Sequence, residues 1–109
     1  MNNEPLSASA QKVQVALTAL GLDCQVVELP GSTRTADEAA QAIGCTVGQI
    51  VKSLVLVRRK TKRTLLVLAS GPNRVDLDVV GAHVGEKLKM ASAERVRQST
   101  GFSIGGVPP

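Results

Sequence analysis

A single lysine, Lys52, stands within an otherwise apolar segment and is the first candidate for chemistry in this sequence. Side chains alternate along a strand, so Lys52 would share one face with Leu54 and Leu56, while the opposite face is also mostly apolar. An ammonium group in such surroundings must reach the rim of the protein, pair with an anion or change its pKa. Two interpretations follow. Either Lys52 binds a phosphate or polarises a carbonyl in a cleft, or its stem covers apolar surface while its ammonium reaches water.

The glycines near the C-terminus are the second candidate. Gly105 and Gly106 precede Val107 and two prolines, and Gly101 lies shortly before them. Because glycine has no Cβ, a ligand can approach such a backbone closely, and free N–H groups can bind an oxyanion or a carboxylate. The same pattern is also typical of an ordinary exit from a strand into a loop. The sequence contains neither a Walker motif nor GxGxxG.

Positive charge is concentrated in one short stretch. Five of the thirteen Lys and Arg lie within residues 58–63, and the other eight are nearly balanced by nine acidic residues. The net charge of +4 is therefore a local patch. This patch predicts either contact with RNA phosphates or a solvated hairpin tip whose lysines discourage edge pairing. The candidate RNA-binding residues are Arg58, Arg59, Lys60, Lys62 and Arg63.

Composition argues against several classes of site. His83 is the single histidine and the carboxylates do not cluster, so neither a metal-hydrolase site nor a Ser-His-Asp triad is expected. Phe102 is the single aromatic residue, which argues against a single-strand binder built on base stacking. Cys24 and Cys45 lack disulfide or zinc spacing, and no apolar run is long enough to span a bilayer. We therefore expect a reduced, cytoplasmic protein without a metal or a membrane partner.

The elements that must position these residues alternate between helix and strand. Apolar spacing and capping residues predict helices over residues 8–20, 36–43, 77–83 and 93–98, with one further turn at 47–50. Thr35 and Glu38 form a capping box, and Asp76 and Ser92 are the other expected caps. Strands are predicted over residues 24–29, 50–58, 64–69, 87–90 and 102–107, with 58–63 as a hairpin turn. The whole chain, 1–109, is expected to form a single mixed α+β domain.

Five segments occur in the order and register of a known family: residues 32–44, 49–54, 74–77, 89–91 and 99–109. The second of these carries Lys52, and the last carries the spacing Gly-x-x-x-Pro from Gly105 to Pro109. With these motifs the chain resembles the YbaK/prolyl-tRNA editing family. That family includes free-standing deacylases and the insertion domain of bacterial prolyl-tRNA synthetases.

The resemblance implies an α+β fold with a mostly antiparallel, barrel-like sheet flanked by helices. It implies a trans-editing deacylase that hydrolyses the ester between a wrong amino acid, Cys or Ala, and the terminal ribose of tRNA-Pro. Lys52 matches the family's essential lysine and would anchor the terminal nucleotide or the aminoacyl carbonyl, while Gly105 would place backbone N–H groups near the oxyanion. Such a site needs no metal, cofactor or protein nucleophile. The implied substrate-binding residues are Thr33, Ser99, Thr100, Gly101, Gly106 and Pro109.

The implied partners are mischarged tRNA and prolyl-tRNA synthetase. Family members continue beyond the Pro-Pro pair with further strands and a helix, so residues 1–109 are expected to be an editing domain that is incomplete at its C-terminus. A missing strand would expose a sheet edge through which two copies could form a homodimer. The alternative function is a non-catalytic RNA- or protein-binding module of the same fold.

Overall fold

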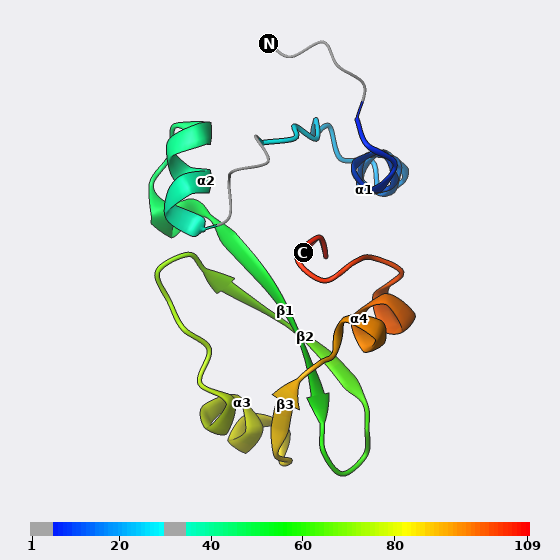
Figure 1. Cartoon of the computed structure of the whole chain (residues 1–109), viewed down its shortest axis with the longest axis vertical. Helices are drawn as coiled ribbons and strands as arrows, with labels where there is room; N and C mark the ends of the chain where they lie inside the picture. Colours follow the sequence, from blue (N-terminus) through cyan, green and yellow to red (C-terminus); the bar gives the residue numbers. More distant parts are fainter. Residues whose placement is uncertain (1–5, 30–34) are drawn as a thin grey trace.

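The three-dimensional structure is a computed structural model of the 109-residue chain, and it describes residues 6–29 and 35–109 (Figure 1). The helices and strands occur along the chain in the following order: α1 (Ala8–Ala19), α2 (Ala36–Ile43), the 3-10 helix η1 (Val47–Gln49), β1 (Val51–Arg58), β2 (Thr64–Ser70), α3 (Leu77–Val84), β3 (Leu88–Met90) and α4 (Ala93–Thr100). The α+β class expected from the sequence is confirmed.

The sheet is antiparallel and has the strand order β2-β1-β3, with β1 in the centre. Strands β1 and β2 form the predicted hairpin, in which Lys52 lies opposite Ala69 and Val57 lies opposite Thr64. The basic residues 58–63 make its turn, where the Arg58 amide donates to the Arg63 carbonyl at 2.8 Å. The described strands form an open sheet rather than a closed barrel.

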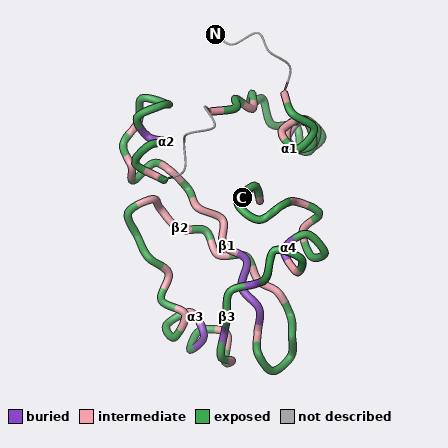
Figure 2. The backbone as a smooth tube through the Cα atoms, in the orientation of Figure 1, coloured by how far each residue is buried: buried purple, intermediate pink, exposed green. Residues whose placement is uncertain are grey.

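The core surrounds the second half of β1, as Figure 2 shows. Leu56 is 0% exposed, and its neighbours Val55 and Val57 are also buried. Val55 and Val57 pack with Ala91 and Val96, so α4 covers one face of the strand. On the Leu56 face, Leu88 of β3 is buried beside Gly81 of α3, and a Cβ at Gly81 would lie 2.8 Å from the Glu86 carbonyl oxygen. Glycine at position 81 therefore allows α3 to pack closely against the chain that leads into β3.

Away from the hairpin turn, β1 and β2 are much less covered by other elements. Val51, Leu66 and Leu68 are 55%, 45% and 51% exposed, and the strand register places all three on one face of the sheet. This face continues the one that α4 covers over Val55 and Val57. The sheet is therefore well packed near the hairpin turn. At the other end, where β1 begins, one face exposes apolar side chains to solvent.

The predicted N-caps at Thr35, Asp76 and Ser92 are confirmed, while in the expected capping box the Glu38 carboxylate accepts from the Thr35 hydroxyl at 3.1 Å. The Thr35 hydroxyl accepts a hydrogen bond from the Glu38 amide at 3.1 Å, and the Asp76 carboxylate accepts from the amide of Asp78 at 2.9 Å. The Ser92 hydroxyl accepts from the amide at the third position of α4. Each cap satisfies backbone donors that have no partner within the first turn of a helix.

The strand predicted over residues 24–29 is wrong. This segment pairs with no strand in the described part of the chain, and the side chain of Gln14 on α1 binds two of its backbone groups. The Gln14 amide nitrogen donates to the Cys24 carbonyl at 2.9 Å, and its amide oxygen accepts from the Val26 N–H at 2.7 Å. A helix side chain therefore takes the place that a neighbouring strand would fill.

The strand predicted over residues 102–107 is also wrong. The Thr100 hydroxyl accepts from the Phe102 amide at 3.0 Å, and the Gly106 amide donates to the Ser103 carbonyl at 2.9 Å. Gly105 has a φ of 82°, in the left-handed region that an extended strand does not visit. Local turns therefore replace the strand in this segment.

Candidate functional site

Lys52 is the second residue of β1, at the open end of the hairpin. Its side chain is half-buried, and its ammonium donates a hydrogen bond to the main-chain carbonyl of Asn73 at 2.7 Å. Asn73 lies in the loop that joins β2 to α3. The ammonium is therefore held in place by an uncharged oxygen.

Three contacts fix the loop that presents the Asn73 carbonyl. The Ser70 hydroxyl donates to the Gly48 carbonyl at 2.6 Å, and the Gly71 amide donates to the Ile50 carbonyl at 2.7 Å. The Asn73 amide then closes a turn onto the Ser70 carbonyl at 2.9 Å. These bonds tie the end of β2 to the 3-10 helix η1 and to the residue before β1.

Gly71 permits this arrangement because it has no side chain. A Cβ at this position would lie 2.3 Å from the Val47 carbonyl oxygen and 3.1 Å from the Ala36 Cβ. Only a backbone without a Cβ can pass so close to η1 and α2. Gly71 thus sets the path of the chain toward Asn73 and, through it, the position of the Lys52 ammonium.

A lysine held in this way keeps its positive charge and most of its N–H donors for a ligand. An ammonium has three N–H donors, and the Asn73 carbonyl accepts one of them. The carbonyl is neutral, so the positive charge is not cancelled by its partner. Lys52 can therefore attract a phosphate, polarise an ester carbonyl or stabilise an oxyanion at the start of β1. Sequence reasoning identified Lys52 but missed this role of Asn73, because a main-chain acceptor leaves no side-chain signal.

The C-terminal glycine loop lies against the other face of β1. Val107 is half-buried and packs on the cluster that contains Val55 and Val57. Alternation along the strand places Lys52 on the opposite face, with Leu54 and Leu56. Gly105 is exposed, and the position that its Cβ would take is open space. The expected roles of Lys52, as anchor of the terminal nucleotide or the aminoacyl carbonyl, and of Gly105, with backbone N–H groups near the oxyanion, stay predictions.

Two of the expected substrate-binding residues have structural partners at the end of α4. The Thr100 hydroxyl donates to the Val96 carbonyl at 2.7 Å, and Gly101 ends the helix with a φ of 78°. The Gly101 carbonyl accepts a hydrogen bond from the Lys12 ammonium, which lies 4.6 Å from the centre of the Phe102 ring. These contacts connect α1 to the end of α4. The other four expected residues are Ser99, Gly106 and Pro109, all exposed, and Thr33, which lies outside the described residues.

The basic hairpin turn is organised by one acidic residue. The Glu86 carboxylate accepts hydrogen bonds from the Lys60 amide at 2.6 Å, from the Thr61 amide at 2.5 Å and from the Thr61 hydroxyl at 3.1 Å. Desolvation is the largest single influence on the pKa of Glu86 and raises it. The hydrogen bonds from Thr61 and Lys60, together with the charge of Arg58, outweigh desolvation and lower the pKa of Glu86 below its ordinary 4.5.

Within residues 6–29 and 35–109, no three side chains of His, Cys, Asp or Glu come together as a metal site would require. None of the helices in the same ranges has the length and apolar character needed to cross a membrane. Cys24 and Cys45 are both free thiols.

The fold and the site define an α+β domain with an open antiparallel sheet, whose central strand carries a lysine held at its exposed end. Residues 31–109 match the family model described as the aminoacyl-tRNA editing domain. This match covers well over half of the chain, and the chain belongs to the aminoacyl-tRNA editing domain family. The family expected from the five sequence segments is thereby confirmed.

The chain is similar to several known proteins, two of which have descriptions that refer to a proline–tRNA ligase or to prolyl tRNA synthetase. The chain is 32% identical over 101 residues to the uncharacterized protein YwhH of Bacillus subtilis, covering 93% of this chain and 64% of that protein. It is 33% identical over 84 residues to a proline–tRNA ligase of Limosilactobacillus fermentum, covering 73% of this chain and 14% of the ligase. A crystal structure provisionally described as a trans-editing enzyme for prolyl tRNA synthetase superposes with a TM-score of 0.89 and 57% identity, covering 96% of this chain and 66% of that one. The chain thus spans about two thirds of the length of YwhH.

Proposed function

We propose that this chain is an aminoacyl-tRNA deacylase that hydrolyses the ester of a mischarged tRNA, with Lys52 as its central catalytic residue. The observation that carries the proposal is the Lys52 ammonium, half-buried at the start of β1 and held by the neutral Asn73 carbonyl. Membership of the aminoacyl-tRNA editing domain family supports this reaction class. The similarity to a protein provisionally described as a trans-editing enzyme for prolyl tRNA synthetase supports tRNA-Pro as the acceptor.

The reaction is a hydrolysis that needs only water as co-reactant. The water oxygen attacks the ester carbonyl carbon and forms a bond to it, and the bond from that carbon to the ribose oxygen breaks. One proton of the water ends on the ribose oxygen, which leaves a free amino acid and a tRNA with a free terminal hydroxyl. The Lys52 ammonium would stabilise the negative charge that develops on the carbonyl oxygen. Holding the ester and the water together would lower the barrier further.

We propose Cys or Ala as the amino acid that is removed. Both side chains are smaller than the proline ring, so a small pocket would accept them and reject the correct amino acid. An apolar pocket separates ligands that differ by one methylene by only about 10–200-fold, so contacts to the tRNA or to prolyl-tRNA synthetase would add to the selectivity.

The test is release of the amino acid from three esters of the same tRNA: Cys-tRNA-Pro, Ala-tRNA-Pro and Pro-tRNA-Pro. We expect faster hydrolysis of one of the first two than of the correctly charged tRNA. Equal hydrolysis of all three at the uncatalysed rate, by a chain shown to be folded, would contradict the proposal.

A non-catalytic RNA-binding module is the second candidate, and the exposed basic hairpin turn favours it. Five of its basic residues lie in one short run, and all but the half-buried Arg58 are exposed. This candidate predicts tRNA binding that weakens steeply with salt in the absence of any hydrolysis.

A further inference from the structure

The fold brings more positive charge to the hairpin turn than the sequence run contains. Strand β3 pairs with the end of β1, so Lys89 lies opposite Val57, and the Arg59 amide donates to the Lys87 carbonyl at 2.9 Å. From α4, the Arg95 guanidinium donates a hydrogen bond to the Lys62 carbonyl. Three elements that are distant in sequence thus meet at this end of the molecule (Figure 1). We call the resulting set the basic pole: Arg58, Arg59, Lys60, Lys62, Arg63, Lys87, Lys89 and Arg95.

Charge is distributed very unevenly between the basic pole and the rest of the chain. It contains eight of the thirteen basic residues and, with Glu86 and Glu94 between them, two of the nine acidic ones. The pole therefore has an excess of six positive charges, while the remainder of the chain has five basic and seven acidic residues. Glu86 is already bound to the amides of Lys60 and Thr61. Such an excess raises the local concentration of anions and speeds the arrival of an anionic partner.

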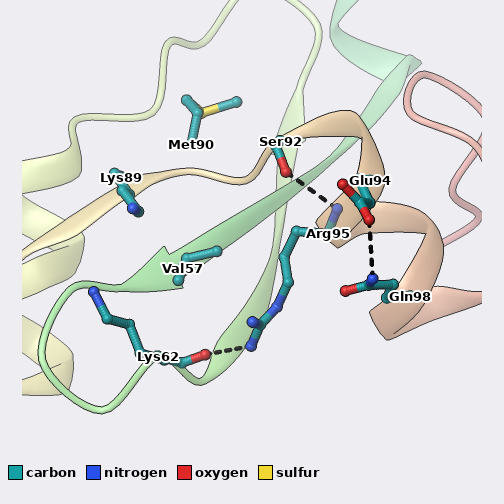
Figure 3. A pocket seen from close by; sticks show the side chains of 8 residues that line it. All are labelled: Val57, Lys62, Lys89, Met90, Ser92, Glu94, Arg95 and Gln98. Carbon is teal, nitrogen blue, oxygen red and sulfur yellow. Dashed lines mark hydrogen bonds between the residues drawn. The ribbon is translucent and has the colours of Figure 1, made fainter.

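A cavity of about 510 Å³ opens within the basic pole. Figure 3 shows side chains from the hairpin turn, β3 and α4 around it, among them Lys62, Lys89 and Arg95. The hydrogen bond from Arg95 to the Lys62 carbonyl joins two of its walls. The rest of the lining is Val57, Met90, Ser92, Gln98 and one acidic residue, Glu94, whose carboxylate accepts a hydrogen bond from the Gln98 amide. The cavity is therefore a concave surface with cations on several sides.

The chemistry of this surface fits the phosphates of a nucleic-acid duplex. The chain has a single aromatic residue, Phe102, which does not line the cavity, so unpaired bases would find no aromatic ring to stack on there. Double-stranded RNA is bound mostly through its phosphates and ribose hydroxyls and through its shape. Lysine and arginine side chains provide such contacts without reading base sequence.

The distance from Lys52 to the pole indicates which part of a tRNA would lie there. Strand β1 runs from Lys52 to Arg58 in six residue steps, which at about 3.3 Å per step is about 20 Å. At about 3.4 Å of rise per stacked nucleotide, this corresponds to about six nucleotides. From an ester held at Lys52, that span passes the short unpaired 3′ end of a tRNA and reaches the first base pairs of its acceptor stem at Arg58, which shares the Lys52 face. The cavity lies on the Val57 face, so a duplex that contacts both would have to pass around the hairpin turn.

We propose that the basic pole binds the backbone phosphates of the acceptor-stem duplex while Lys52 holds the aminoacylated 3′ end. This inference rests on the proposed function for the position of the 3′ end. It assigns to Lys87, Lys89 and Arg95 a role that neither the sequence run nor the site at Lys52 suggested.

The test compares two exposed basic residues, one inside and one outside the pole. Lys89→Glu and Arg97→Glu change the charge equally, and Arg97 lies on α4 but outside the pole. The first measurement is binding of an uncharged RNA minihelix with the acceptor-stem sequence, at several salt concentrations. We expect Lys89→Glu to weaken binding on the order of tenfold at low salt and to reduce the salt slope by about 1, with a smaller effect of Arg97→Glu.

The second measurement uses an aminoacyl ester on a short single-stranded 3′ end without the duplex. Lys89→Glu should raise KM for the aminoacylated minihelix but leave hydrolysis of the short ester unchanged. Equal effects of the two substitutions on minihelix binding, or salt-independent binding by the unchanged chain, would overturn the proposal and favour a protein partner. Minihelix binding that depends on Lys89, without hydrolysis of any ester, would support the pole and contradict the deacylase function.

Discussion

The Lys52 ammonium suits the proposed hydrolysis because its hydrogen-bond partner is a neutral main-chain carbonyl. A carboxylate at the same place would cancel the charge, whereas the Asn73 oxygen fixes the position of the ammonium and leaves the charge available. The position of this oxygen depends in turn on Gly71 and on the turn that follows it. One residue without a side chain thus supports the residue that would do the chemistry.

The substitution Gly71→Ala tests this dependence. Its Cβ would lie 2.3 Å from the Val47 carbonyl oxygen, so the loop must move, and we expect a loss of about 1–3 kcal/mol in the free energy of unfolding. Hydrolysis should also fall, because the Asn73 carbonyl moves with the loop. Urea denaturation gives the stability, with Gly48→Ala as the matched control, since a Cβ at Gly48 would meet its nearest atom at 3.9 Å. Equal stability of the two variants would show that Gly71 does not set the loop.

At the scale of the elements, the hairpin turn depends on Glu86 from the segment between α3 and β3. Its carboxylate holds two amides of the turn, and these bonds lower the pKa of Glu86. A carboxyl group whose pKa is lower in the folded state stabilises that state above its unfolded pKa. This contribution is lost as the pH falls through the folded pKa.

The substitution Glu86→Gln should therefore lower the melting temperature at pH 7. The difference from the unchanged chain should shrink as the pH falls below 4.5 and through the lowered pKa of Glu86, because the carboxyl group of the unchanged chain then also becomes neutral. Thermal melts at several pH values measure this difference. Glu94→Gln is the control, because the Glu94 carboxylate accepts from the Gln98 side chain and holds no turn amide in the hydrogen bonds described. A difference for Glu86→Gln that is independent of pH would contradict this account.

Local signals in the sequence were sufficient for most of the elements. Thr35, Asp76 and Ser92 cap helices through atoms a few residues away, so their pattern could be interpreted without knowing the fold. The segment 24–29 has the composition of a strand, but a strand also needs a partner, and Gln14 binds its backbone instead. Whether a segment becomes a strand depends on distant parts of the chain, which its own residues do not specify.

The same distinction applies to the candidate sites. Lys52 is visible in the sequence because a charge stands out in an apolar strand. The Asn73 carbonyl has no side-chain signature, and Lys87, Lys89 and Arg95 look like scattered surface residues until β3 pairs with β1 and α4 meets the hairpin turn. The sequence therefore indicated five of the eight residues of the basic pole and, at the candidate site, the lysine alone.

On the scale of the whole molecule, β1 connects two candidate sites of different character. Lys52 lies at its beginning, where the sheet is open and apolar side chains are exposed, and the basic pole lies at its end. The buried residues Val55, Leu56 and Val57 lie between them and anchor the strand in the core. A single strand could thus set the distance between the bound duplex and the ester that is hydrolysed.

The most direct test of the account is the single-turnover rate of hydrolysis of Cys-tRNA-Pro and Ala-tRNA-Pro by Lys52→Ala. Lys12→Ala is the matched control, because the Lys12 ammonium also donates to a main-chain carbonyl, that of Gly101. We predict that Lys52→Ala lowers the rate by about 100-fold or more while the variant stays folded, and that Lys12→Ala stays close to the unchanged chain. A folded Lys52→Ala variant that hydrolyses these esters as fast as the unchanged chain would contradict the central claim.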